Sequence, residues 1–336
     1  MLTLLKKIFV VASLLLMTVC FNEVVSADSN DFSIMPILPE NQNPDVPSYF
    51  DLTVIPSQKQ KLQVQIKNNS NENQKYRIYV NTATTNQNGI IDYSISDFEK
   101  DESMKIYLKD CITLEENQVE VSANSEKTLS FELSVPEEVF EGILLGGITI
   151  EPIVEEGKKS VNNVFTRTIA IQLSETTSEI VPKLEGGKVS VSQENLRNNI
   201  KFELRNSTPI IISKVRAEIA ITKQGVETPV LEQTKEQLSF APNSKFNLMT
   251  EWNNQFKPGK YMYSIHLNDE KGNKWDFNQE FEIKSEVAEK LNEKSVDEKK
   301  SSIQDYLIYI IGVLTSIFIG FVIWMVSKRL KKHKQK

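Results

Sequence analysis

Apolar and polar residues alternate along many short stretches of the chain, and this period of two predicts β-strands. Leu62, Val64 and Ile66 form one such set, with polar residues between them. Alternation of this kind places one face of a sheet on a core and the other in water, as in antiparallel sheets. The same pattern recurs in residues 76–80, 129–135, 169–173, 189–191, 200–204, 215–221, 246–248, 261–267 and 281–283.

The strand pattern repeats along the chain, which indicates two related domains. Residues 62–70 match residues 200–207, because each is an alternating strand that ends in a base and a polar turn. Residues 123–131 similarly match residues 241–248. Regularly spaced short strands are typical of β-sandwiches. We therefore predict an all-β fold with two tandem immunoglobulin-like β-sandwiches, over residues 28–182 and 183–284.

Both ends of the chain have the composition of targeting segments. Lys6 and Lys7 precede an apolar run, and Val25-Ser26-Ala27 has the small residues of a cleavage site, so residues 1–27 are predicted to be a signal peptide. Residues 306–326 carry no charge, and at ~1.5 Å per residue they would extend about 31 Å, enough for a transmembrane helix. The basic tail, residues 327–336, would then stay in the cytoplasm.

These ends predict a single-pass plasma membrane protein whose N-terminal ectodomain lies outside, on the cell wall side. Residues 285–305 are rich in Glu, Lys, Ser and Asp and are predicted to form a solvated, charged stalk, in which short runs such as residues 286–291 are compatible with helix. Three alternatives are weaker. The first apolar run is short for an uncleaved anchor, Val19 rather than a small residue precedes Cys20 as a lipidation site, and a buried core helix would rarely lack charge all round.

Charge limits the ligands of the ectodomain. The chain has 39 Lys and Arg against 45 Asp and Glu. Removing the two ends takes away eight bases and one acid, so the ectodomain keeps 31 bases and 44 acids, a net charge of −13. An acidic surface repels nucleic acid and other anionic polymers. Binding of a glycan or a protein would therefore depend on hydrogen bonds and ring stacking.

Few residues are available for catalysis. Cys111 is the only cysteine beyond the signal and His266 the only ectodomain histidine, so a zinc cluster or a Cys-His pair has almost no ligands to draw on. No nucleophile elbow, phosphate loop or calcium loop occurs. We predict that Cys111 is a small buried apolar residue and that His266 is an exposed strand residue. The sequence predicts no enzymatic activity, no cofactor and no metal, and a single unpaired cysteine is typical of a Gram-positive surface protein rather than a disulfide-rich secreted one.

One enzymatic alternative stays open at this stage. Paired carboxylates can hydrolyse glycosidic bonds, and the chain has many acids. The pairs Glu115-Glu116, Glu137-Glu138 and Glu155-Glu156 fall in predicted turns, where charge is expected for solubility. A wall-remodelling glycan hydrolase without a recognisable motif is therefore the alternative to a binding protein.

Several motifs together resemble a known family. The most specific are residues 81–93, with Asn81-Thr82-Ala83-Thr84-Thr85-Asn86 and Gly89-Ile90-Ile91-Asp92-Tyr93, and residues 142–148, with a Gly-Gly pair inside a strand. Residues 32–42, 49–52, 68–70 and 205–207 fit as well. In these features the chain resembles the WxL-interacting cell-surface proteins of Gram-positive bacteria, over about residues 31–327.

The resemblance implies a non-enzymatic adhesion protein. Its N-terminal domain would bind peptidoglycan, its C-terminal domain would bind host extracellular matrix proteins, and WxL-domain surface proteins would be its partners. For the glycan-facing loop we select residues with amide and hydroxyl groups, which suit sugars without needing charge: Asn81, Thr84, Thr85, Asn86 and Asn88. The alternative is a long ordered turn whose side chains bond their own backbone.

Overall fold

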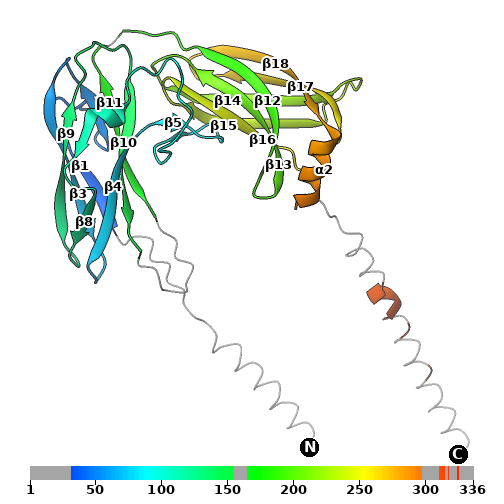
Figure 1. The fold of residues 1–336 in the computed structure, drawn as a ribbon, viewed down its shortest axis with the longest axis horizontal. Helices are drawn as coiled ribbons and strands as arrows, with labels where there is room; N and C mark the ends of the chain where they lie inside the picture. Colours follow the sequence, from blue (N-terminus) through cyan, green and yellow to red (C-terminus); the bar gives the residue numbers. More distant parts are fainter. Residues whose placement is uncertain are drawn as a thin grey trace, which may run out of the picture.

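The computed structural model describes residues 32–154, 165–176, 178–296, 310–314, 317 and 324. These residues form two β-sandwiches with a short ribbon between them, as Figure 1 shows. The prediction of a predominantly β chain with tandem sandwiches is confirmed. Signal peptide 1–27, tail 327–336 and most of the predicted span 306–326 lie outside the described residues. Within the described part, no helix is long and apolar enough to cross a bilayer.

The first sandwich has the strand order of an immunoglobulin domain. Its two sheets run β1-β3-β9-β7 and β2-β11-β10-β4-β8, which correspond to strands A-B-E-D and G-F-C with β2 and β8 added at the edges. β2 pairs parallel with β11, and the other pairs are antiparallel. The strands are β1 (Phe32–Ile37), β2 (Phe50–Thr53), β3 (Lys59–Asn68), β4 (Gln74–Thr82), β7 (Ile112–Leu114), β8 (Gln118–Val121), β9 (Glu126–Ser134), β10 (Leu144–Pro152) and β11 (Arg167–Ser174).

The second sandwich is a variation on the same plan. Its sheets run β12-β13-β16 and β15-β14-β17-β18. The segment between β4 and the 3-10 helix η1 (Leu108–Cys111) adds a two-stranded ribbon, β5 (Thr84–Thr85) with β6 (Ile91–Asp92). The remaining strands are β12 (Leu184–Glu194), β13 (Arg197–Asn206), β14 (Ile212–Lys223), β15 (Leu231–Phe240), β16 (Ser244–Glu251), β17 (Gly259–Asn268) and β18 (Lys274–Ile283).

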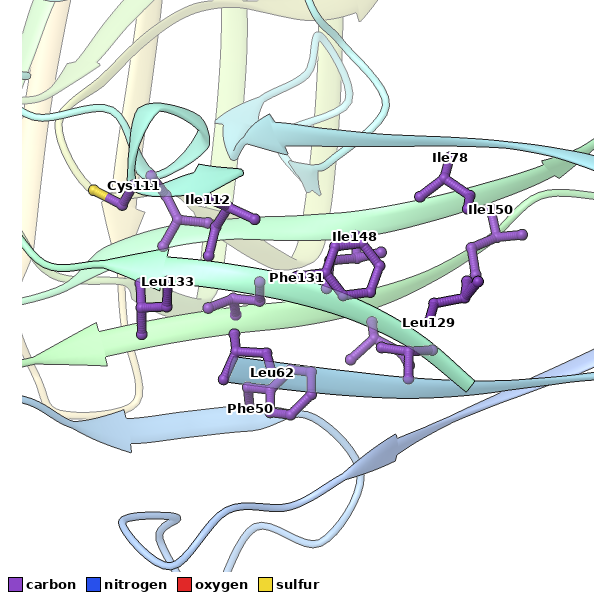
Figure 2. Close-up of a cluster of buried hydrophobic side chains, with 14 of the residues drawn as sticks. Phe50, Leu62, Ile78, Cys111, Ile112, Leu129, Phe131, Leu133, Ile148 and Ile150 are labelled. Atoms are coloured by element: carbon purple, nitrogen blue, oxygen red, sulfur yellow. The ribbon is translucent and has the colours of Figure 1, made fainter. Parts of the chain in front are cut away.

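Alternating residues fill each core. On β3, Leu62, Val64 and Ile66 are fully buried, and they pack with side chains from the facing sheet, such as Ile148 (Figure 2). Burying one such side chain contributes roughly 1.5–3 kcal/mol. Cys111 is buried at the edge of this core (Figure 2), and burial, with the nearby Asp110 charge, raises the pKa of its thiol to about 11. The thiol therefore stays protonated at neutral pH.

The internal repeat has a structural cause. β3 and β13 each end in a fully buried asparagine, Asn68 and Asn206. The Asn206 amide donates to the Ile210 and Ala241 carbonyls, and its Oδ1 accepts from the backbone N–H and the hydroxyl of Thr208. Asn68 makes the equivalent set of bonds. Each asparagine thus satisfies the backbone groups of the turn that leads to the next strand.

The segment after β18 differs from its prediction. Residues Ser285–Lys294 form helix α2, which packs against the second sandwich (Figure 1). Ala288 is buried, and the Asn292 side chain both donates to the Phe256 carbonyl and accepts from its N–H. The prediction of a solvated stalk is therefore wrong for residues 285–294. Helix within residues 286–291 was anticipated, but its packing on the sandwich was not, because only Ala288 and Leu291 supply apolar contacts.

Replacement of Asn206 by Ala should lower the free energy of unfolding by about 4 kcal/mol, because four hydrogen bonds that contribute about 1 kcal/mol each are lost. Urea denaturation of residues 28–300 measures this. The control is Asn88→Ala at an exposed turn position, where a change within about 0.5 kcal/mol is expected. Equal stabilities for the two variants would show that the buried amide has no special role.

Candidate functional site at the junction of the two sandwiches

The predicted ligand loop lies between the two sandwiches, where Figure 1 shows β5. Asn81, Thr84 and Thr85 are buried, with 5%, 2% and 4% of their surface exposed. Asn86 is half-buried, and Asn88 is exposed. The structure thus brings these five residues together in one segment, but it turns three of them inward toward protein rather than outward toward solvent.

The polar groups of this loop bond within the chain. Thr85 Oγ1 accepts a hydrogen bond from the Ala241 N–H (2.9 Å) and shares another with Ser244 Oγ (2.7 Å), so it ties the loop to the second sandwich. Asn86 Oδ1 accepts from the N–H groups of Asn88 and Ile90. The bonds of Asn86 match the alternative prediction, an ordered turn whose side chains bond its own backbone. Contact of the loop with a ligand stays a prediction.

The tip of the loop rests on β15 and β16. The Gly89 carbonyl accepts from the Ser239 N–H (2.8 Å), and the Gln87 carbonyl accepts from the Met249 N–H (2.8 Å). Gly89 has φ +74°, and a Cβ at this position would lie 3.1 Å from Leu238 Cδ2. Only glycine combines this backbone conformation with so close an approach. The loop therefore packs along the edge of the second sandwich, against β15 and β16.

An apolar cluster fills the centre of the junction. Ala83 and Leu145 from the first sandwich meet Ala241 from the second, and all three are buried. The partly buried side chains around them are Ile91, Tyr93, Ile143 and Ile211. The Ile143 N–H donates to the Pro209 carbonyl at 2.7 Å, which joins the β10 approach to the turn before β14. Small apolar residues and backbone bonds thus let the two domains approach closely.

Ion pairs surround this cluster. The Asp101 carboxylate has only 2% of its side chain exposed, and it lies 2.5 Å from Arg205 Nε on β13. Lys245 on β16 contacts Glu99 at 2.7 Å and Glu203 at 3.3 Å. Burial acts to raise the pKa of Asp101, but hydrogen bonds from Ser103 and Arg205 outweigh it and hold the pKa below the ordinary value of 3.8. Asp101 is therefore ionised at neutral pH.

Sequence reasoning missed the junction role of this segment. Its amide and hydroxyl groups indicated a ligand surface, because those groups suit sugars and backbone equally well. A signal was present in the apolar residues Ile91 and Tyr93, which come shortly after Gly89 and pack on the junction cluster. Apolar residues inside a long polar loop indicate that it packs against protein.

A second candidate surface is a shallow hollow of about 500 Å³ on the outer face of the β15-β14-β17-β18 sheet. Ala220 leaves the space, and His266 lies beside it, paired across the strands with Glu218 and Asp276. His266 Nδ1 and Asp276 Oδ1 are 2.6 Å apart. As predicted, His266 points away from the core that buries Tyr263 and Ile265. The hollow combines carboxylates with hydroxyl and amide groups: Glu218, Glu232, Thr234, Ser264, Asp276 and Asn278.

The fold and these surfaces define a tandem-sandwich protein with binding domains. Residues 32–152 match the family model for the WxL Interacting Protein, peptidoglycan binding domain, and residues 156–293 match the model for its host binding domain. The chain therefore belongs to the WxL interacting protein family. Strand β11 lies within the second matched range, yet it pairs with β10 and β2 and so completes the first sandwich.

Other comparisons add little. No curated protein matches the chain. Among solved structures, the chain is similar to the CupB2 chaperone of Pseudomonas aeruginosa (10% identity, 68% of this chain and 95% of that one, TM-score 0.30). It is also similar to the E. coli chaperone DraB (13%, 75% and 98%, 0.29) and to the YadV chaperone (10%, 75% and 100%, 0.32). We draw no conclusion from TM-scores this low. Among the described residues, no group of three His, Cys, Asp or Glu side chains could hold a metal ion.

Replacement of Gly142 by Ala should open the junction. Gly142 has φ +71°, and a Cβ there would lie 2.2 Å from the Pro209 carbonyl oxygen. Hydrogen exchange should quicken at Ser239 and Met249, whose N–H groups bond to the loop. The control is Gly225→Ala, which has the same backbone strain at φ +82° but no atom within 4 Å. Unchanged exchange in the Gly142 variant would contradict a close-packed junction.

Asp101→Asn should destabilise the junction by about 1.5–3 kcal/mol at neutral pH, the range for a hydrogen bond to a charged group. Because the folded pKa is lowered, the carboxylate stabilises the fold above pH 3.8 and loses this contribution as the pH falls through the folded value. The stability gap between the parent chain and the variant should therefore close below about pH 3.8, which urea denaturation across pH can follow.

The matched control for Asp101 is Glu99→Gln. Glu99 also pairs with a base of the second sandwich, but 68% of its side chain is exposed, so a loss of at most about 1 kcal/mol is expected. A gap for the Asp101 variant that persists at low pH would rule out the charge as its cause.

Proposed function

We propose that this protein is a membrane-tethered, non-enzymatic surface protein that bridges peptidoglycan and WxL-domain proteins. The observation that carries the proposal is the tandem match, in which a peptidoglycan binding domain is followed directly by a host binding domain. The first sandwich would bind the wall. The second would bind a WxL-domain protein and host extracellular matrix proteins.

Display outside the membrane is part of the proposal. The signal pattern of residues 1–27, the uncharged run 306–326 and the basic tail 327–336 support a single-pass orientation with the sandwiches on the wall side. In this position the first sandwich meets peptidoglycan, and the acidic ectodomain would keep clear of anionic wall polymers by charge repulsion.

The second sandwich offers a surface suited to a protein partner. The hollow beside Ala220 is open and carries Glu218, Glu232 and Asp276, which a basic segment of a partner would complement. Charged groups of this kind favour rapid and selective encounter more than high affinity. The junction keeps this surface at a fixed position relative to the first sandwich, so both ligands can be bound at once.

Sedimentation with sacculi tests the proposal. Residues 28–300 are mixed with purified sacculi stripped of teichoic acid, and the pellet is assayed for protein while the supernatant is assayed for muropeptides. We expect protein in the pellet and no released fragments. A WxL-domain protein added afterwards should reach the pellet only when this protein is present.

The controls separate the parts of the proposal. Ala220→Arg fills the hollow and adds a positive charge, so it should reduce capture of the WxL-domain protein while leaving sacculus binding unchanged. Released muropeptides would establish hydrolysis instead. Protein that stays in the supernatant without fragments would remove peptidoglycan from the function.

A further inference from the structure

The outer face of the β2-β11-β10-β4-β8 sheet has little charge along its middle. Each of the other outer faces carries ion pairs along its strands. They include Lys67–Glu126 at 3.2 Å on β3 and β9, Lys201–Glu194 at 2.6 Å on β13 and β12, and Arg216–Glu218 at 2.9 Å on β14. On this face the Arg77–Glu151 pair, 3.8 Å apart, lies toward one end. Lys75 and Glu120, which pair across β4 and β8, lie toward the same end, and Asp51 lies on the edge strand β2. Between them, the outward polar groups are hydroxyls, amides and tyrosine rings.

The strand register sets the floor of this face. Thr168, Thr149 and Tyr79 form one row across β11, β10 and β4, and Thr149 Oγ1 shares a 2.8 Å hydrogen bond with Thr168 Oγ1. In the next row, Ala170 and Gly147 carry almost no side chain. Thr149 is fully buried, so the surface here is formed by the exposed Thr168 and the half-buried Tyr79 ring.

Two more tyrosines lie next to this floor. A Cβ at Gly147 would be 3.1 Å from Tyr93 Cδ1, so the Tyr93 ring packs directly on the glycine. The Asn81 amide donates to the Tyr93 carbonyl at 2.9 Å and holds the residue in place. Burial, with a smaller contribution from Tyr49, raises the pKa of Tyr93 to about 12. Tyr49 directly precedes Phe50, which pairs with Ile171, so the strand register places Tyr49 beside Ala170.

The side-chain amide of Gln172 lies on the same face as these tyrosines. Gln172 on β11 donates to Asp51 Oδ1 at 2.7 Å, and Asn43 donates to Asp51 Oδ2 at 2.8 Å. The Asp51 carboxylate is thus occupied by amides, and the Gln172 side chain is fixed beside the rings. We call Tyr49, Tyr79, Tyr93, Thr168 and Gln172 the tyrosine face. It belongs to the sheet whose Leu145 end meets the second sandwich (Figure 1).

We infer that the tyrosine face is the binding site for the glycan strand of peptidoglycan, rather than for its stem peptides. Sugar rings present C–H faces that pack on aromatic rings, and their hydroxyl and acetamido groups hydrogen-bond to hydroxyl and amide side chains. None of these contacts needs a charge on the protein. The ectodomain, with its net charge of −13, opposes the carboxylates of stem peptides.

This inference depends on the proposed function, so its test uses the same ligand. The full chain in detergent is titrated with sacculi stripped of teichoic acid. Tyr79→Ala should weaken binding about tenfold through loss of the ring, while Tyr79→Phe should stay within about threefold. Thr168→Ala, at an exposed position, should also weaken binding, and its matched control is Thr128→Ala on the outer face of β9.

A second arm distinguishes the parts of the ligand. Amidase digestion of sacculi removes the stem peptides with their cross-links and leaves soluble glycan strands, which are titrated against the same full chain. Retained affinity supports the glycan site, and lost affinity overturns it. Unchanged binding by both Tyr79→Ala and Thr168→Ala would also overturn it, and the threonine variant decides if the tyrosine variant fails to fold. Absence of binding by the parent chain would instead refute the proposed function.

Discussion

The arrangement of the two sandwiches depends on one contact, the burial of the β5–β6 segment between them. Two immunoglobulin-like domains joined only by a linker are expected to move relative to each other. Here the Thr85 hydroxyl, the Gly89 carbonyl and the Gln87 carbonyl all bond to the second sandwich. The segment comes from the first domain but completes the edge of the second. The tyrosine face and the hollow beside Ala220 are therefore held at a fixed separation.

The chemistry of the junction matches this role. Its apolar centre is small, and ion pairs and backbone hydrogen bonds add further links to the second sandwich. Such a mixed interface is weaker per unit area than a domain core, yet each buried polar group must find a partner. Asp101 shows the consequence most clearly, because its buried carboxylate stays ionised only through Ser103 and Arg205. The asparagine and threonine side chains of the loop likewise provide hydrogen-bond partners for polar groups at the junction.

The sequence was informative where one residue type has one physical use. Period-two alternation predicted the strands because a sheet face is either buried or exposed. The repeated Asn-containing turns were visible because Asn68 and Asn206 do the same work. The purpose of residues 81–88 was not predictable, since amides bind a glycan or a neighbouring domain equally well. The packing of helix α2 was also not predictable, because its contact depends on Ala288, Leu291 and the polar Asn292.

Helix α2 has a mechanical consequence. It follows β18 directly and is held to the sandwich at Asn292, and the Val296 N–H donates to the Leu196 carbonyl in the β12–β13 turn. Tension on the chain beyond residue 296 would therefore act first on this bond and on the helix contacts, before it reaches β18. The ten residues of α2 extend about 15 Å as a helix and roughly 34 Å when stretched. Peeling α2 away would thus lengthen the connection by about 20 Å while both sandwiches stay folded. A pulling force would therefore detach the helix before it distorted the tyrosine face or the hollow beside Ala220.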